Sequence, residues 1–211
     1  MAPADISVYG TLLSGHTHRV ALLLRMLDIP YRFVDTPSAA RKSAEFRALN
    51  PFGQIPVLKD GDLVLADSNA ILVYLAKQYG QGTRWLPEDP VGASRVQRWL
   101  SIAAGEVKYG PSYARLYTLW HRPGDMAQAR EIAFDLLRFM EAHLASVGGG
   151  WLAADHETLA DLACYSYVAH APEGRIPLEP YPAVRAWIRR VESLPGFLPM
   201  PASEIPPDPR T

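Results

Sequence analysis

Residues 50–69 read NPFGQIPVLKDGDLVLADSN, and this stretch decides the fold that the sequence predicts. Two short apolar runs, VLK and LVLA, flank Asp60-Gly61, a pair that suits the positive φ angles of a tight hairpin turn. Pro56 comes directly before the first run, and Asp67-Ser68 comes directly after the second. The stretch therefore predicts a β-hairpin that is entered through a proline and is followed by the start of a helix.

The segments on either side of this hairpin alternate between strand and helix patterns. ISVYG at 6–10 is short and β-favouring, and the apolar residues after SGHTHR recur at helical spacing until Pro30 approaches. YRFVDT and RKSAEFRAL then predict a second strand and a short helix, and the helix after the hairpin ends at Gly80. This β-α-β-α-β-β-α order, with a proline before its third strand, predicts a thioredoxin-like α/β domain over residues 1–80.

The second half of the chain has a different pattern. From about residue 91 the strand signal disappears, and a helical stripe predicts one helix that runs towards Trp120, with three further helices after it. The segment GQGTRWLPEDP is rich in glycine and proline and is expected to be the linker, whereas the proline-rich tail after Leu194 is expected to be extended. We therefore expect an all-helical domain over residues 91–211.

Composition limits the kinds of partner that the chain can have. The 211 residues carry a formal net charge of −1, which argues against a nucleic acid or an anionic membrane as partner. With Cys164 as the single cysteine, neither a disulfide framework nor a cysteine-based metal site can form within one chain. The sequence shows no signal peptide and no run of apolar residues long enough to span a membrane. We expect a cytoplasmic protein without a metal.

Pro56 has two interpretations. In isolation it would be an ordinary trans proline, because only about 5–6% of X-Pro bonds in folded proteins are cis. Its position before the third strand of a thioredoxin-like order favours a cis bond instead. A cis bond would turn the N–H and C=O of Ile55 outward, where an extended peptide could pair with them as an added strand.

Asp67-Ser68 and Thr158-Leu-Ala-Asp161 both mark predicted helix starts. Asp or Ser is an ordinary N-cap residue, but a helix N-terminus also binds anions, so Ser68 could hold a substrate carboxylate. For Thr158 and Asp161 the structural interpretation is preferred, because a threonine cap and an acidic residue three positions later form a capping box. From capping alone, Asp161→Ala would cost about 0.5–2 kcal/mol of stability.

Together these features resemble the cytosolic glutathione transferases, and the resemblance covers essentially the whole chain. RKSAEFRALNPFGQIPVLKDGDLVLADS resembles the glutathione-binding segment of that family, especially in its phi-like and bacterial branches, and ETLADLA resembles the capping box of a later helix. The resemblance implies that Gln54 and the backbone of Ile55, before a cis Pro56, hold the cysteinyl part of glutathione. It also implies that Asp67 and Ser68 bind its γ-glutamyl end.

The resemblance places cations at the other end of the tripeptide. Lys42, together with Arg41, would pair with the glycyl carboxylate. Glutathione is an anionic tripeptide, so a site with cations at one end and an oriented helix terminus at the other suits it.

The segment SGHTHR carries the candidates for activating the glutathione thiol. Ser14 lies five residues before Arg19, the S-x-x-x-x-R spacing of serine-type members, and we expect its hydroxyl to stabilise the thiolate. The alternative role of Ser14 is to cap the helix. Thr17 is a rival donor, and His16 is a third candidate, which would act as a neutral donor at a helix N-terminus. The segment contains no cysteine, which argues against thiol–disulfide exchange chemistry.

Tyr109 and Tyr113 are the candidates for binding the second substrate. They recur at helical spacing with Tyr117, a pattern that packing alone could explain. In the family that this chain resembles, the corresponding helix lines the electrophile site, where a tyrosine hydroxyl could stabilise developing negative charge.

The sequence therefore predicts a homodimeric glutathione transferase that adds the glutathione thiolate to small hydrophobic electrophiles in detoxification. One alternative is glutathione-dependent reduction of peroxides, or an isomerisation, at the same site. Another is a protein that binds glutathione or hydrophobic ligands with little catalysis.

Overall fold

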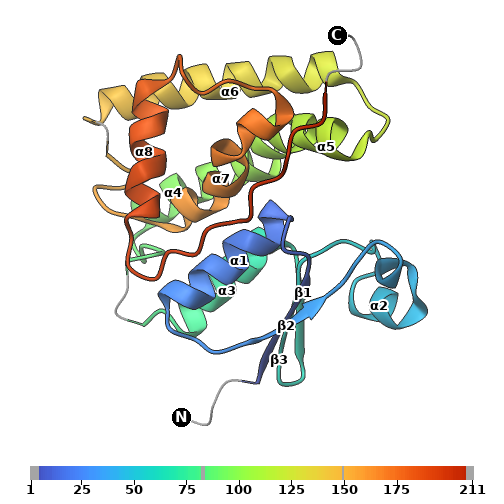
Figure 1. Cartoon of the computed structure of the whole chain (residues 1–211). Helices are drawn as coiled ribbons and strands as arrows, with labels where there is room; N and C mark the ends of the chain where they lie inside the picture. Colours follow the sequence, from blue (N-terminus) through green and yellow to red (C-terminus); the bar gives the residue numbers. More distant parts are fainter. Residues whose placement is uncertain (1–4, 82–83, 149, 208–211) are drawn as a thin grey trace. The chain divides into compact units, whose positions relative to one another are not determined.

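The contacts of the chain divide it into two compact units, which are described one at a time. The computed structural model describes residues 5–81, 84–148 and 150–207 (Figure 1). Unit 1 comprises Met1–Leu86 and Leu194–Pro201, and unit 2 comprises Pro87–Ser193 and Ala202–Thr211. The expected linker falls where the first segment of unit 1 ends, and its residues Gly82 and Thr83 lie outside the described residues.

Unit 1 is built on a four-stranded sheet with the order β2-β1-β3-β4. Its strands are β1 (Ile6–Gly10), β2 (Arg32–Asp35), β3 (Val57–Asp60) and β4 (Leu63–Ala66). β1 runs parallel to β2 and antiparallel to β3, so that Val8 lies opposite both Phe33 and Leu58. Val8 and Leu58 are fully buried. The predicted order of elements along the chain, β-α-β-α-β-β-α, is confirmed.

The hairpin forms where the sequence predicted it, but its turn is shifted by one residue. Asp60 is the last residue of β3 and pairs with Leu63, so the loop is Gly61-Asp62 and not Asp60-Gly61. Of these residues only Gly61 has a positive φ, of 56°. The glycine therefore occupies the one loop position where a Cβ would be unfavourable, and the aspartate before it remains in the strand.

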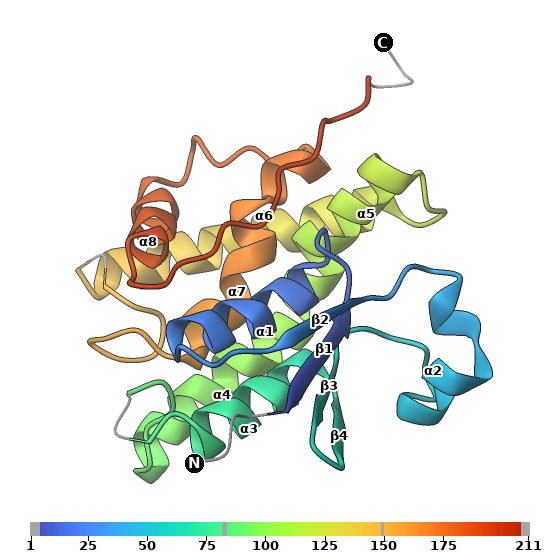
Figure 2. The same ribbon diagram turned by 60° about the horizontal axis from the view of Figure 1, so that its bottom comes forward.

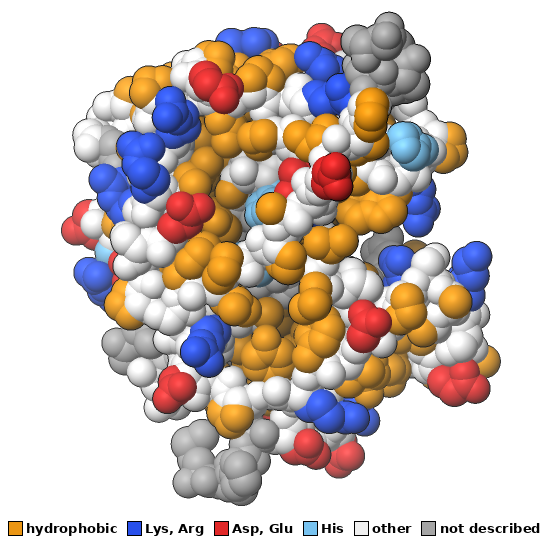
Figure 3. Space-filling view, viewed as in Figure 1, with side chains coloured by type: hydrophobic (Ala, Val, Ile, Leu, Met, Phe, Trp, Pro, Cys, Tyr) orange, Lys and Arg blue, Asp and Glu red, His pale blue; other side chains and the backbone are white. Residues whose placement is uncertain are grey.

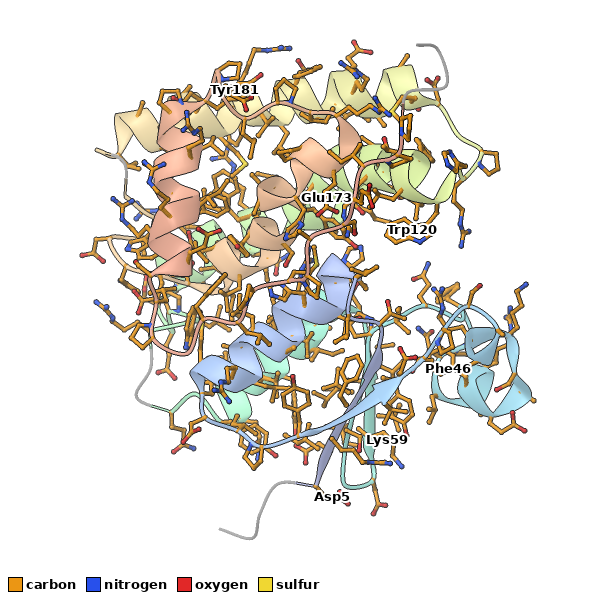
Figure 4. All side chains as sticks on the ribbon, in the orientation of Figure 1. Asp5, Phe46, Lys59, Trp120, Glu173 and Tyr181 are labelled. Atoms are coloured by element: carbon orange, nitrogen blue, oxygen red, sulfur yellow. The ribbon has the colours of Figure 1, made fainter. Side chains whose placement is uncertain are left out.

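Three α-helices and a 3₁₀ turn complete the described part of unit 1. They are α1 (Gly15–Met26), η1 (Ala40–Lys42), α2 (Ala44–Leu49) and α3 (Ser68–Gln78). Figures 1 and 2 both place α1 and α3 side by side on one face of the sheet and α2 away from them, beyond the sheet. Phe46 of α2 is buried, and its ring centroid lies 6.4 Å from that of Tyr9 in β1, which anchors the short helix (Figure 4).

Asp60 also fastens α3 to the hairpin. Its carboxylate accepts hydrogen bonds from the hydroxyls of Tyr74, at 2.7 Å, and of Tyr79. Burial, with the hydrogen bond to Asp60 and its negative charge, raises the pKa of Tyr74 to about 12. Both tyrosines therefore remain protonated donors at neutral pH, and the C-terminal half of α3 is held to the hairpin by these contacts.

The segment Leu194–Pro201 lies with unit 1, although residues 91–211 were expected to form the helical domain. The Nε2 of His18 in α1 is 2.6 Å from the carbonyl oxygen of Leu198. Gly196 has a φ of 76°, and a Cβ on it would lie 3.2 Å from the carbonyl oxygen of Arg25. The tail therefore packs along α1 through its backbone, and the sequence pattern of side chains does not predict such contacts.

Unit 2 is helical in its described residues. Its elements are α4 (Pro90–Ala104), the π-helical turn η2 (Lys108–Ser112), α5 (Tyr113–Trp120), α6 (Met126–Ser146), α7 (Leu159–Ala169), the 3₁₀ turn η3 (Ala171–Gly174) and α8 (Pro182–Glu192). α7 is buried on all sides from Leu159 to Val168, which makes it the central helix, and Cys164 is one of its core residues. Across the described ranges, no helix is both long enough and apolar enough to cross a membrane.

The single helix predicted from residue 91 towards Trp120 is interrupted, so that prediction was wrong. α4 ends at Ala104, and Gly105 has φ −97° and ψ −96°, which is outside helical geometry. The chain then makes a π-helical turn that contains Pro111 before α5 begins. Proline lacks the N–H that an α-helix would use at this position, so a wider turn replaces the regular hydrogen-bond ladder.

A buried ion pair fixes the segment after residue 201 within unit 2. The Nε of Arg115 in α5 donates to Glu173 at 2.5 Å, and both side chains are almost fully buried. Glu173 also accepts hydrogen bonds from the backbone N–H of Ser203 and pairs with His170. Burial acts to raise the pKa of Glu173, but its hydrogen bonds and the Arg115 charge outweigh burial and lower it.

The predicted capping box at α7 is confirmed, and Asp161 does more than cap. Its Oδ2 accepts from the N–H of Thr158 at 2.9 Å and from its hydroxyl. Its Oδ1 accepts from the N–H of Leu152 at 3.0 Å and from the indole N–H of Trp187 at 2.9 Å. Asp161 is fully buried, so one carboxylate joins α7 to α8 and to the loop before α7.

We expect Asp161→Ala to lower the free energy of unfolding by about 3–5 kcal/mol, because it leaves several buried donors without an acceptor. The matched control is Asp125→Ala, which removes the exposed N-cap of α6 and should cost only about 1 kcal/mol. Urea denaturation followed by tryptophan fluorescence measures both. Equal losses in the two variants would show that Asp161 acts only as a cap.

Candidate functional site

Ser14 occupies the start of α1 in a way that leaves its hydroxyl proton available. It is the N-cap residue, with extended backbone, and its Oγ accepts a hydrogen bond of 3.3 Å from the N–H of Thr17. A serine hydroxyl has one proton and two acceptor lone pairs, and capping uses a lone pair only. Ser14 can therefore cap the helix and donate to a bound anion at the same time, so its two interpretations do not exclude each other.

Thr17 faces the sheet. It is 2% exposed, and a Cβ placed on Gly10 would lie 2.2 Å from its Cγ2, so the threonine fills the space that the glycine leaves. Its hydroxyl is buried and has no hydrogen-bond partner within the described part of the chain. This environment favours Ser14 over Thr17 as a donor to a ligand.

Arg19 joins the start of α3 to α1. The guanidinium is 1% exposed, and its Nη1 donates to Asn69 Oδ1 at 2.9 Å and to Ser68 Oγ at 3.3 Å. The third candidate donor, His16, is also directed to α3, with its Nδ1 3.4 Å from Ser68 Oγ. Sequence reasoning used Arg19 only as the marker that aligned Ser14, and the contacts to α3 were not anticipated.

The start of α3 is shaped by Asp67. This residue has φ 74° and ψ 120°, which is unusual for a residue with a Cβ, and its side chain accepts from the N–H groups of Asn69 and Ala70. Asp67 is therefore the N-cap, and Ser68 is the first residue of the helix and is largely buried. A helix N-terminus carries partial positive charge, so the site suits an anion.

The loop before β3 contains the predicted cis bond. The Ile55-Pro56 peptide is cis, as the order of elements predicted. Among the described residues, no hydrogen bond engages the backbone N–H or C=O of Ile55. This peptide group can therefore accept an extended ligand as an added strand.

Asn50 positions this loop, and sequence reasoning missed it. Asn50 is 5% exposed, and its amide donates to the carbonyl oxygen of Gln54 at 2.9 Å while its Oδ1 accepts from the N–H of Phe52. It orients the peptide that precedes Ile55. Its position three residues before the loop glycine Gly53 was the available signal, because asparagine in a turn commonly bonds to the backbone two residues on, here that of Phe52.

Gly53 allows the turn η1, which carries two cationic side chains, to lie close to the loop before β3. Its φ is 63°, and a Cβ on it would lie 3.1 Å from the carbonyl oxygen of Arg41. Arg41 and Lys42 are the last two residues of η1, and the side chain of Lys42 is exposed while that of Arg41 is partly buried. The turn with the two cations is therefore adjacent to the loop that contains Gln54.

The tyrosines of unit 2 form a ladder of edge-to-face ring contacts. The ring centroids of Tyr109 and Tyr113 are 5.2 Å apart, and those of Tyr113 and Tyr117 are 5.6 Å apart, in edge-to-face geometry. Tyr109 is 44% exposed, and the Nζ of Lys108 lies 5.0 Å from its ring centroid. The ladder is thus a packing feature that also presents aromatic surface.

Charge is mixed on the surface. On the face shown in Figure 3, basic and acidic side chains are interspersed among apolar ones over the described residues. This distribution agrees with the formal net charge of −1 and provides no extended basic surface on that face.

Two family models match the chain. "Glutathione S-transferase, N-terminal domain" matches residues 8–83, and "Glutathione S-transferase, C-terminal domain" matches residues 125–197. The chain is 35% identical to glutathione S-transferase 3 of Zea mays, with 98% of each chain covered, and 29% identical to glutathione S-transferase theta-1 of Homo sapiens, with 90% and 84% covered.

Solved structures agree with the sequence matches. A glutathione S-transferase from Pseudomonas fluorescens superposes with a TM-score of 0.86 at 31% identity, covering 92% of this chain and 98% of that one. A glutathione transferase homologue from Drosophila mojavensis, which has bound glutathione, gives a TM-score of 0.81 at 26% identity, covering 91% and 89%.

We expect Gly53→Ala to lower both stability and glutathione affinity for two reasons. Gly53 has a positive φ, which disfavours a residue with a Cβ, and the new Cβ would also crowd the carbonyl oxygen of Arg41. Gly61→Ala is the matched control, since Gly61 has φ 56° and nothing lies within 4 Å of a Cβ placed there. The control should lose about 1–2 kcal/mol of stability and keep its affinity. Chemical denaturation and calorimetric titration with glutathione measure the two effects. An unchanged affinity for Gly53→Ala would show that this contact does not shape the site.

Proposed function

Because this chain belongs to the glutathione transferase family, we propose that it adds the thiolate of glutathione to small hydrophobic electrophiles, with Ser14 as the thiolate-stabilising donor. The observation that carries the proposal is the geometry at the start of α1. The Ser14 hydroxyl there caps the helix through a lone pair and keeps its proton for a ligand. Glutathione is the co-substrate of the enzyme.

The energetics of the thiol support this role. A free thiol has a pKa of about 8.5, and lowering it by about two units requires about 2.7 kcal/mol. A hydrogen bond to a charged group contributes about 1.5–3 kcal/mol, and a helix N-terminus about 0.3–2 kcal/mol. One hydroxyl donor at the first turn of α1 is therefore sufficient to make most of the thiol nucleophilic at neutral pH.

The rest of the tripeptide has complementary groups in unit 1. The free backbone groups of Ile55 suit the cysteinyl residue, with Gln54 beside them. The start of α3 suits the γ-glutamyl end, where Ser68 would donate to the carboxylate and the exposed carboxylate of Asp67 would pair with the amino group.

The glycyl carboxylate is assigned to the cations of η1. Lys42 is exposed and can reach an anion as a flexible point charge, and Arg41 is the second candidate. The contact between the Arg41 backbone and Gly53 supports this assignment, because it holds the turn against the loop that would carry the ligand.

The second substrate is assigned to the tyrosine ladder of unit 2. Tyr109 presents the most exposed ring, and Tyr113 stacks against it. Aromatic surface suits a small hydrophobic electrophile, and a tyrosine hydroxyl can stabilise negative charge that develops on it.

The proposal includes a cytoplasmic, detoxifying homodimer. Phe52 is 84% exposed and Leu63, in the edge strand β4, is 41% exposed. Phe52 belongs to the loop before β3, and an exposed large apolar side chain of this kind supports a surface that another chain covers. A light-scattering measurement of the mass in solution tests the assembly.

We expect Ser14→Ala to raise the pKa of the bound thiol toward that of a free thiol, about 8.5, and to lower turnover at neutral pH with little effect on glutathione affinity. Thiolate absorbance in a pH titration of the binary complex measures this. Thr17→Val is the matched control, because it removes a buried hydroxyl of the same turn and keeps the side-chain volume. If Thr17→Val raises the thiol pKa and Ser14→Ala does not, the donor is Thr17.

The reaction class is tested by a substrate panel. We expect turnover with a chloronitrobenzene to exceed turnover with a hydroperoxide, because the site offers a stabilised thiolate and no second thiol in SGHTHR. A greater rate with the hydroperoxide would favour the peroxidase alternative. Retention on immobilised glutathione without turnover on any electrophile would favour a binding protein.

A further inference from the structure

His16 has a contact that separates it from the thiol donors. It lies in the first turn of α1, two residues after Ser14, yet its Nδ1 is 3.4 Å from the Oγ of Ser68 at the start of α3. Ser14 bonds instead to the N–H of Thr17 within its own helix. The two side chains of one turn therefore have different partners, one local and one on the neighbouring helix.

The hydroxyl of Ser68 has a limited number of hydrogen bonds to distribute. It has one proton and two acceptor lone pairs. The Nη1 of Arg19 donates to it at 3.3 Å, and a guanidinium cannot accept a proton, so this contact uses a lone pair. The Ser68 proton must then point either to the Nδ1 of His16 or away from both neighbours.

The protonation of His16 Nδ1 decides between these two directions. If Nδ1 carries no proton, it accepts from Ser68 and takes up the single hydroxyl proton. If Nδ1 carries a proton, it donates to the second lone pair of Ser68 Oγ, and the hydroxyl proton is released towards a ligand. A serine that receives two hydrogen bonds is also held in one orientation.

We propose that His16 is a positioning residue for glutathione, which donates from Nδ1–H to Ser68 and so directs the Ser68 hydroxyl proton to the γ-glutamyl carboxylate. This inference rests on the proposed function. It removes His16 from the candidates that contact the sulfur and gives it a role at the other end of the tripeptide. His16 therefore determines the affinity for glutathione, whereas Ser14 determines the pKa of its thiol.

The competing interpretation is that His16 only fills space between α1 and α3. His16→Asn and His16→Leu separate the two possibilities, because asparagine offers a donor N–H on the atom next to Cγ, where histidine carries Nδ1, and leucine offers none. A packing role would be served by leucine at least as well as by asparagine. A donor role would be served by asparagine alone.

The experiment measures the dissociation constant of glutathione by calorimetry and the pKa of the bound thiol by thiolate absorbance. We expect His16→Leu to weaken glutathione binding by up to about tenfold, the upper end for the loss of one neutral hydrogen bond, because leucine no longer holds the Ser68 hydroxyl towards the carboxylate. The thiol pKa should stay unchanged. His16→Asn should bind within about threefold of the unaltered protein, since it restores the donor.

A double-mutant cycle with Ser68→Ala isolates the coupling between His16 and Ser68, and circular dichroism of each variant checks that it is folded. In the Ser68→Ala protein, His16→Leu should cause no further loss of affinity, because the two residues act through one hydrogen bond. Equal additional losses in both backgrounds, equal effects of Leu and Asn, or a raised thiol pKa in His16→Leu would each overturn the role of His16. Failure of the unaltered protein to bind glutathione would instead overturn the proposed function.

Discussion

The buried guanidinium of Arg19 is the constraint on which the architecture of unit 1 depends. A charge removed from water must keep its hydrogen bonds, because breaking a buried charged contact costs several kcal/mol, about 3–5 in measured cases. The Nη1 of Arg19 makes its hydrogen bonds to Ser68 and Asn69, which belong to another helix. The starts of α1 and α3 therefore cannot separate without breaking these buried hydrogen bonds.

Each part of the site is also positioned by a local hydrogen bond that leaves a neighbouring polar group available for a ligand. Ser14 caps its helix and keeps a proton, Asp67 caps the next helix and leaves Ser68 as its first residue, and Asn50 orients the peptide before the cis bond. The backbone of Ile55 is left without internal partners in the described residues. In the proposed complex, an anionic peptide would meet donors at separate positions that the fold already holds in place, which would reduce the ordering that binding requires.

The sequence predicted those features that depend on near neighbours. The order of elements, the cis bond at Pro56 and the capping box at Asp161 follow from local patterns, and the family resemblance follows from motifs. Sequence reasoning failed where two turn positions were equally favourable, or where contacts between residues far apart in the sequence determine the structure. Asp60-Gly61 and Gly61-Asp62 both satisfy a glycine turn, and only the pairing of the strands selects the second. The contacts of Arg19 to α3 cross about fifty positions of sequence, and no local pattern reveals them.

The central claim is that a serine hydroxyl at the start of α1 stabilises the thiolate of a glutathione whose γ-glutamyl end lies at the start of α3. A crystal structure of the complex with glutathione tests it most directly. The account predicts the sulfur within hydrogen-bond distance of Ser14 Oγ and the γ-glutamyl carboxylate on Ser68, with the cysteinyl backbone paired to Ile55. A sulfur placed against His16 or Thr17, or a tripeptide bound in the reverse direction, would contradict it.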